Sequence, residues 1–183
     1  MGRPATFVRL AGCNLKCEGC DTDHHTWREM SPEDVLQDVI GDRVVVTGGE
    51  PALQMDGLSR LIDLLCEDGK EVHMETNGTK ALREDDLKRM SCIVVSPKRG
   101  SNVDLARWSL YENVHFKFVL GPEDWCWTEK DLKGLLPELP RKRAWIMPFG
   151  TDRGLNFARD AWDLALELGV NYSDRLHIRL GKR

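Results

Sequence analysis

The sequence predicts an α/β fold in which strands and helices alternate around a parallel sheet. Short runs of β-branched residues are regularly followed by longer amphipathic segments, which is the pattern of successive βα units. Several amphipathic segments begin at residues that commonly cap helices. No Pro/Gly/Ser-rich linker, low-complexity tract or repeat interrupts the alternation, so we expect a single domain over residues 1–183.

The expected strands are short and distributed along the chain. They are Thr6–Leu10, Arg43–Val46, Glu71–Glu75, Ile93–Ser96, Val114–Leu120 and Ala144–Pro148. Because ligands of such sheets bind at the carboxyl ends of the strands, motifs that directly follow a strand are the candidates for function.

The helices are predicted from their caps and their apolar faces. Ser31 precedes a proline at the first helical position, and Thr128 is followed three residues later by the carboxylate of Asp131. Gly69 follows a helix whose aliphatic face is made by Leu58, Leu61, Ile62 and Leu65. We expect a similar packing face on the last long helix, made by Trp162, Ala165, Leu166 and Leu168.

Composition excludes several classes of protein. The net charge is −4, from 26 Lys and Arg against 30 Asp and Glu, and no basic block is present to hold nucleic acid by charge alone. No apolar run approaches the length of about 18 residues that crosses a bilayer, and Met1–Pro4 is neither a signal nor a transit peptide. We expect a cytoplasmic protein that binds neither nucleic acid nor membrane directly.

The cysteines divide into a cluster and three scattered residues. Cys66, Cys92 and Cys126 lie singly in apolar surroundings, and we expect them to pack in the core as small hydrophobes. A Cys-x3-Cys-x2-Cys loop after the first strand is made by Cys13, Cys17 and Cys20. Three thiolates this close can converge on one soft metal centre. Two interpretations are open, a 4Fe-4S cluster with one iron left free and a zinc site completed by His24 or His25.

Three further motifs follow expected strands. They are Thr47–Pro51, which contains paired glycines, Glu75–Thr79 and Ser96–Lys98. Glycines let a ligand approach the backbone closely, and the polar groups beside them can orient it. We therefore expect all three motifs to open on the same face as the cysteine loop.

On these motifs the chain resembles the radical S-adenosylmethionine (SAM) superfamily and, within it, the 7-carboxy-7-deazaguanine synthase family. The superfamily resemblance rests on the cysteine spacing together with Gly48–Pro51. The narrower one rests on Phe7–Asn14, Cys20–Thr22, Thr47–Pro51, Glu75–Thr79, Ser96–Lys98 and Arg175–Ile178. The resemblance implies an open, partial βα barrel of the TIM-like, radical SAM type, for which 183 residues suffice although a complete barrel needs roughly 250.

The resemblance also implies two cofactors. A 4Fe-4S cluster would be held by Cys13, Cys17 and Cys20, and its free iron would bind the amino and carboxylate groups of SAM. One electron would then split the sulfonium, and the 5′-deoxyadenosyl radical would abstract hydrogen from the substrate. The SAM-binding residues carried over from the family are Gly49, Ser96, Pro97, Lys98, Met147, Pro148, Phe149 and Gly150.

Substrate and metal residues follow from the same resemblance. A salt bridge is the default role for Arg9, because a guanidinium buried in an apolar strand beside Phe7 needs a partner. Its match to a substrate-contacting arginine of the family favours a grip on the substrate carboxylate, with Thr47 as a second contact. Thr22 would ligate Mg²⁺. No residue is assigned as a catalytic acid, base or nucleophile, and His177 has no assigned role.

The implied reaction converts 6-carboxy-5,6,7,8-tetrahydropterin into 7-carboxy-7-deazaguanine with loss of ammonia, on the route to queuosine and other 7-deazapurines. SAM would be regenerated, and a flavodoxin or ferredoxin would donate the electron. The family resemblance implies a homodimer. We expect Trp125–Trp127 to anchor a loop or pack in the core rather than form an exposed patch for a partner.

Both ends of the chain differ from the family pattern. Family members normally carry an extra strand and a substrate-contacting Gln-Gly-Glu-Gly loop before the segment that starts here at Gly2. The expectation is that the true start lies upstream, that the substrate is recognised differently, or that activity is impaired. Gly181–Arg183 offers no counterpart of a carboxy-terminal substrate contact.

Two other functions stay open as alternatives. A glycyl-radical-enzyme activase shares the cysteine spacing, but it would need neither Ser96–Lys98 nor Arg9. A zinc-stabilised binding protein without catalysis would use the cysteine loop for structure alone.

Overall fold

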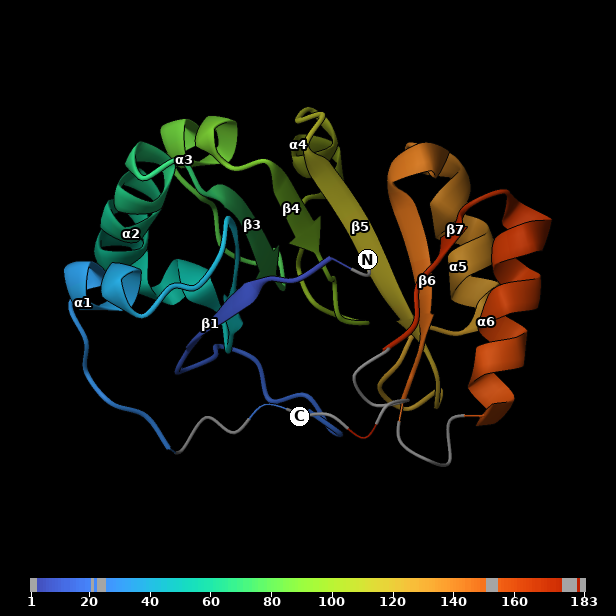
Figure 1. Ribbon diagram of the computed structural model, residues 1–183. Helices are drawn as coiled ribbons and strands as arrows, with labels where there is room; N and C mark the ends of the chain where they lie inside the picture. The colour runs from blue at the N-terminus through green and yellow to red at the C-terminus, as the bar shows by residue number, and fades with distance from the viewer. Residues whose placement is uncertain (1–2, 21, 23–25, 151–154, 176–180, 182–183) are drawn as a thin grey trace. The chain divides into compact units, whose positions relative to one another are not determined.

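A computed structural model describes residues 3–20, 22, 26–150, 155–175 and 181, which form two compact units (Figure 1). The first unit runs to Val95 and includes Tyr111–Asn113, and the second comprises Ser96–Leu110 and the chain from Val114 onward. Each unit consists of parallel strands and helices, which confirms the predicted α/β class. That the chain acts as one domain remains a prediction.

The first unit contains a parallel sheet whose strands pair in chain order. Its strands are β1 (Thr6–Leu10), β2 (Arg43–Gly48), β3 (Glu71–Thr76) and β4 (Cys92–Val95). The connecting helices are α1 (Pro32–Gln37), α2 (Met55–Glu67) and α3 (Glu84–Arg89), with a 3-10 turn, η1 (Pro51–Gln54), ahead of α2. The helices lie together on one side of these strands (Figure 1).

The core of the first unit is formed by the sheet and the inner face of α2. The buried apolar residues of the strands are Val44, Val46, Val72, Met74, Ile93 and Val95. The aliphatic face predicted for α2 is also buried, at Leu58, Leu61, Ile62 and Leu65. Gly69, with φ +73°, adopts the left-handed conformation just after this helix, as expected of a helix terminator.

The second unit repeats the arrangement with a smaller set of parallel strands. They are β5 (Val114–Leu120), β6 (Ala144–Pro148) and β7 (Asn171–Tyr172). The helices are α4 (Leu105–Ser109), α5 (Glu129–Leu135) and α6 (Leu155–Leu168), with 3-10 turns η2 (Leu136–Glu138) and η3 (Arg141–Arg143). Phe116, Phe118 and Ile146 are fully buried between strands and helices.

Two helices begin with the caps that the sequence predicts. Ser31 Oγ accepts a hydrogen bond from Asp34 N (3.1 Å), and Thr128 Oγ1 accepts one from Asp131 N (3.2 Å). In each case the carboxylate accepts in return from the backbone N–H of the capping residue. These capping boxes satisfy backbone donors that would lack a partner inside the helix.

The last helix departs from the prediction. Ala161, Leu164 and Ala165 of α6 are buried, whereas Trp162 and Leu166 are 51% and 67% exposed, so the predicted burial of these two was wrong. Small alanine side chains let the helix lie close to β6, while the Trp162 ring lies edge-on to Tyr172 with centroids 5.3 Å apart. The buried face of α6 is therefore made by Ala161, Leu164 and Ala165, and it does not include Trp162 or Leu166.

The other differences concern the ends of elements. β2 continues to Gly48 and β3 to Thr76, whereas β4 spans Cys92–Val95 rather than the predicted Ile93–Ser96. β7 was not predicted, because two residues carry no periodic signal. Among the described residues, no helix has the length and hydropathy needed to span a membrane.

Candidate functional site

The three clustered cysteines lie on the loop that leaves β1. Cys13 and Cys17 are half-buried and Cys20 is exposed, and Cys20 N donates a hydrogen bond to Cys17 O (3.3 Å). Cys13 Sγ accepts from Leu15 N at 3.5 Å. Across the described ranges, no three His, Cys, Asp or Glu side chains are already gathered as a metal site. His24 and His25, the candidate zinc ligands, lie outside the described residues, as do Asp21 and His177.

The end of β2 holds the start of this loop. Gly49 N donates to Leu10 O and Glu50 N donates to Gly12 O, both at 2.8 Å. A Cβ at Gly49 would lie 1.7 Å from Gly12 O, and one at Gly48, where φ is +129°, would lie 2.1 Å from Leu10 O. The paired glycines are therefore required for close contact between β2 and the loop. From the sequence we expected the paired glycines to let a ligand approach the backbone, and this stays a prediction. The structure shows that they let the start of the cysteine loop approach it.

Glu50 joins the loop after β2 to the loop after β3. Its side chain is fully buried, and its carboxylate accepts hydrogen bonds from Ala52 N (3.1 Å), Thr76 Oγ1 (2.7 Å) and Asn77 N (2.7 Å). A buried carboxylate requires such donors. Glu50 had no role predicted from the sequence, although a carboxylate two positions beyond a buried strand is a signal that could have indicated one.

The loop after β3 is tied in turn to the cysteine loop by a ring of three side chains. Asn77 Nδ2 donates to Asn14 Oδ1 (3.1 Å), Asn14 Nδ2 donates to Thr79 Oγ1 (2.8 Å), and Thr79 Oγ1 donates to Asn77 Oδ1 (2.7 Å). Asn77 Nδ2 also lies 3.9 Å from Cys13 Sγ, within reach of an N–H···S hydrogen bond. The Glu75–Thr79 motif thus lies against the first cysteine, as its place after a parallel strand predicts.

The predicted substrate and magnesium residues come together at the same edge of the sheet. Arg9 and Thr47 are directly paired in the register of β1 and β2. Arg9 was expected to be buried, but it is exposed, because half-buried and exposed residues alternate along β1 and Arg9 lies on the exposed face. Its Nη1 donates a hydrogen bond to Thr22 Oγ1 (3.1 Å). Thr47 is buried and donates to Glu75 Oε2 (3.3 Å). The arrangement presents a cation and hydroxyl groups close to the cysteine loop.

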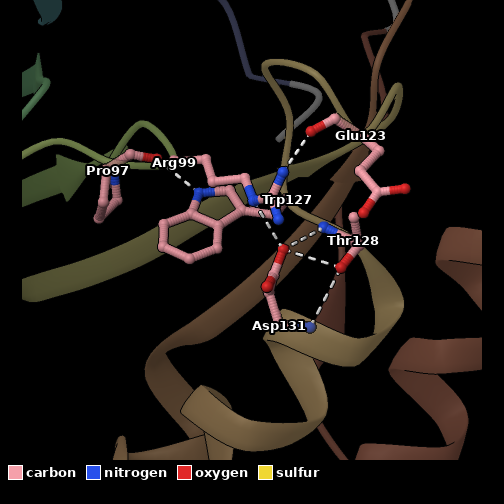
Figure 2. Close-up of polar contacts among 6 residues, drawn as sticks. All are labelled: Pro97, Arg99, Glu123, Trp127, Thr128 and Asp131. Carbon is pink, nitrogen blue, oxygen red and sulfur yellow. Dashed lines mark hydrogen bonds and ion pairs between the residues drawn. The ribbon is translucent and has the colours of Figure 1, made fainter.

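The Ser96–Lys98 motif belongs to the second unit. Ser96 and Pro97 are buried and Lys98 is half-buried, with Lys98 Nζ donating to Ser96 O (3.1 Å) and Ser96 Oγ (3.0 Å). The loop between β5 and α5 braces the motif, because Trp127 Nε1 donates to Pro97 O at 2.8 Å (Figure 2). This contact supports the anchoring role expected for the Trp125–Trp127 segment.

A charged network continues this brace (Figure 2). Arg99 donates to Glu123 O and forms an ion pair with Asp131, with Nε 2.9 Å from Oδ2. Hydrogen bonds from Thr128, with a smaller contribution from Arg99, lower the pKa of Asp131. The cap of α5 therefore also fixes the residue next to Lys98.

The Met147–Gly150 segment ends β6 in the second unit. Met147 and Pro148 are buried, and Phe149 N donates to Leu120 O (2.7 Å). The Phe149 ring lies edge-on to Trp125, with centroids 4.4 Å apart. The segment is thus held by the same aromatic loop that braces Pro97.

The scattered cysteines behave differently from the clustered ones. Cys126 is buried, whereas Cys66 and Cys92 are half-buried, so full burial was predicted correctly for one of the three. Burial raises the pKa of the Cys66 and Cys92 thiols, which disfavours the thiolate that binds metals. Their environment suits packing.

Comparison with known proteins gives a consistent result. A family model described as the Radical SAM superfamily matches residues 8–95. A 7-carboxy-7-deazaguanine synthase of Hyperthermus butylicus is 32% identical in an alignment 203 residues long. The alignment covers 97% of this chain and 84% of that protein. One of Bacteroides thetaiotaomicron is 41% identical over 109 residues, and there the match spans 58% of this chain and 57% of that protein.

The fold is similar to a solved structure as well. The crystal structure of QueE from Escherichia coli matches with a TM-score of 0.69 and 25% identity, covering 95% of this chain and 86% of that one. This likeness bears out the fold class expected from the sequence, an open, partial βα barrel.

Proposed function

The chain belongs to the 7-carboxy-7-deazaguanine synthase family of radical SAM enzymes, and from this membership we propose that it converts 6-carboxy-5,6,7,8-tetrahydropterin into 7-carboxy-7-deazaguanine with release of ammonia. Such an enzyme is a carbon-nitrogen lyase. The observation that carries the proposal is the grouping of Arg9, Thr22 and Thr47 at the carboxyl ends of β1 and β2, next to the cysteine loop.

We assign the cluster to the thiols of Cys13, Cys17 and Cys20. The donor set fits, because three soft ligands lie on one loop and N–H groups of Leu15 and Asn77 are directed at Cys13 Sγ. When bound, the 4Fe-4S cluster and SAM provide one-electron radical chemistry. This chain's own contribution is to hold the cysteine loop in place, through the hydrogen bonds that Gly49 N and Glu50 N donate to its start.

The SAM-binding residues are proposed in three groups. Gly49 is assigned to the methionine end, where its backbone already contacts the start of the cysteine loop. Ser96, Pro97 and Lys98 provide hydroxyl, carbonyl and ammonium groups, and the brace from Trp127 keeps their loop in one conformation. Met147, Pro148, Phe149 and Gly150 are proposed as further SAM contacts.

Arg9 is proposed to bind the substrate carboxylate. Its guanidinium is exposed and donates to the Thr22 hydroxyl, so a substrate carboxylate can replace a neutral contact with a bidentate, charge-assisted one. Thr47 contributes a second polar contact on the neighbouring strand. Thr22, within 3.1 Å of Arg9, is proposed to ligate Mg²⁺ beside that carboxylate.

Replacing Arg9 with lysine should weaken pterin binding selectively. Lysine keeps the charge but loses the forked pair of donors, so KM for the pterin should rise by about tenfold to a hundredfold, as expected for charge-assisted hydrogen bonds. Arg60→Lys is the matched control, since Arg60 forms an exposed ion pair with Glu33. Steady-state kinetics would refute the assignment if both variants kept the parent KM.

An anaerobic assay of ammonia release tests the proposed function. With reconstituted protein, SAM, Mg²⁺, reduced flavodoxin and the carboxytetrahydropterin, ammonia should appear in proportion to the pterin consumed. Omission of SAM or of the reductant should stop the release. A protein that holds zinc, lacks iron and releases no ammonia would instead fit the binding-protein alternative.

The remaining properties follow from the family alone. We propose that flavodoxin or ferredoxin supplies the electron, that the protein is a cytoplasmic homodimer, and that its product enters the biosynthesis of queuosine or another 7-deazapurine. Size-exclusion chromatography with light scattering tests the homodimer.

A further inference from the structure

We propose that Asn77 is a positioning residue that raises the reduction potential of the cluster, by donating an N–H···S hydrogen bond to Cys13 Sγ. The inference rests on the proposed function, because it concerns the cluster assigned to the cysteine loop. Asn77 is buried and its Nδ2 lies 3.9 Å from the sulfur.

The direction of the amide is determined by its other contacts. Asn77 Oδ1 accepts from Thr79 N (2.9 Å) and from Thr79 Oγ1 (2.7 Å). A backbone N–H can only donate, so the side-chain atom that faces Thr79 must be the oxygen. The amide nitrogen is therefore the atom that faces Cys13, and its other hydrogen has a separate acceptor in Asn14 Oδ1 at 3.1 Å.

The backbone of Asn77 is held just as firmly. Asn77 N donates to Glu50 Oε2 at 2.7 Å, and Glu50 is itself fully buried and fixed by Thr76 and Ala52. Both the main chain and the side chain are therefore tied to neighbouring loops. A donor held in this way lies at the sulfur before a cluster binds, so little reorganisation is required.

Hydrogen bonds to cluster sulfurs favour the reduced state. Reduction adds negative charge to the cluster and its thiolates, and a donor stabilises the more negative form. Within the described part of the chain, Cys13 Sγ has two such donors, Leu15 N at 3.5 Å and Asn77 Nδ2. Of these two, Asn77 is the side chain that mutation can remove.

The test is a potentiometric titration of the reconstituted cluster, followed by electron paramagnetic resonance in the absence of pterin. Asn77→Ala removes the donor, and the ratio of reduced to oxidised cluster at a fixed potential should fall by up to about tenfold, which for a one-electron couple is about 59 mV. Asn77→Asp keeps an acceptor for Thr79 and loses the donor, so it should shift the ratio in the same direction.

Asn113→Ala is the matched control. Asn113 Nδ2 also donates twice, to Leu87 O (2.8 Å) and Met90 O (2.7 Å), but these acceptors precede β4, away from the loops that follow the strands. It should lower stability and leave the potential unchanged.

Several outcomes would overturn the inference. An unchanged potential in Asn77→Ala would do so, as would an equal shift in Asn113→Ala or a shift confined to Asn77→Asp, which would reflect charge alone. Loss of iron from both Asn77 variants, with full loading of Asn113→Ala, would assign Asn77 a purely structural role. If the parent protein formed no iron cluster, the proposed function itself would fail, and the two failures are thereby distinguished.

Discussion

Replacing Gly49 with alanine should dismantle the cysteine loop. The added Cβ would lie 1.7 Å from Gly12 O and 2.4 Å from Gly12 C, so the backbone that leads into Cys13 must move. That movement breaks the hydrogen bonds from Gly49 N to Leu10 O and from Glu50 N to Gly12 O. Overpacking together with lost backbone bonds should cost about 3 kcal/mol of unfolding free energy. The iron content of Gly49→Ala after reconstitution should also fall, because the displaced loop carries the three cysteines.

A second glycine provides the control for this change. Gly57 lies inside α2, and a Cβ there meets nothing within 4 Å. Gly57→Ala should leave iron content unchanged and stabilise the protein by about 0.5 to 1 kcal/mol, because alanine favours the helix. Denaturant unfolding and iron analysis measure both effects. Full iron loading of Gly49→Ala would show that close contact between β2 and the loop is not required.

Replacing Cys17 with alanine should abolish cluster binding and all SAM-dependent activity. Two thiols on the loop are too few to hold a 4Fe-4S cluster with one open iron, so iron should fall to background and the visible absorbance of the cluster should vanish. Stability of the apoprotein should change little, because Cys17 is half-buried on a loop.

Cys66→Ala separates a ligand from a packing cysteine. Cys66 is half-buried in α2, and burial raises its thiol pKa, so we expect the variant to retain its iron content and activity. Equal loss of iron from Cys17→Ala and Cys66→Ala would contradict the division of the cysteines. Retention of tightly bound zinc by the parent protein, without iron, would contradict the cluster.

Much of the scaffold was predictable because its signals are local. β1, β5 and β6 have the predicted bounds, since each is a β-branched or aromatic run between turn residues. The capping boxes at Ser31 and Thr128 follow from residues three positions apart. The motifs after β1, β2 and β3 come together in the first unit because the carboxyl ends of parallel strands share one edge.

The features that sequence did not predict depend on contacts between distant segments. Nothing local shows that Glu50 receives donors from the loop after β3, or that Asn14, Asn77 and Thr79 close a ring. Arg9 was expected to be buried because strand periodicity gives the face of a residue but not what covers that face. For the same reason, helical spacing did not show that Trp162 would remain exposed.

The identity of the product tests the proposed function most directly. Under anaerobic conditions, with SAM, Mg²⁺ and reduced flavodoxin, the protein should convert 6-carboxy-5,6,7,8-tetrahydropterin into 7-carboxy-7-deazaguanine, identified by mass spectrometry, while SAM is recovered unconsumed. Cleavage of SAM to 5′-deoxyadenosine and methionine without any deazaguanine would contradict the account.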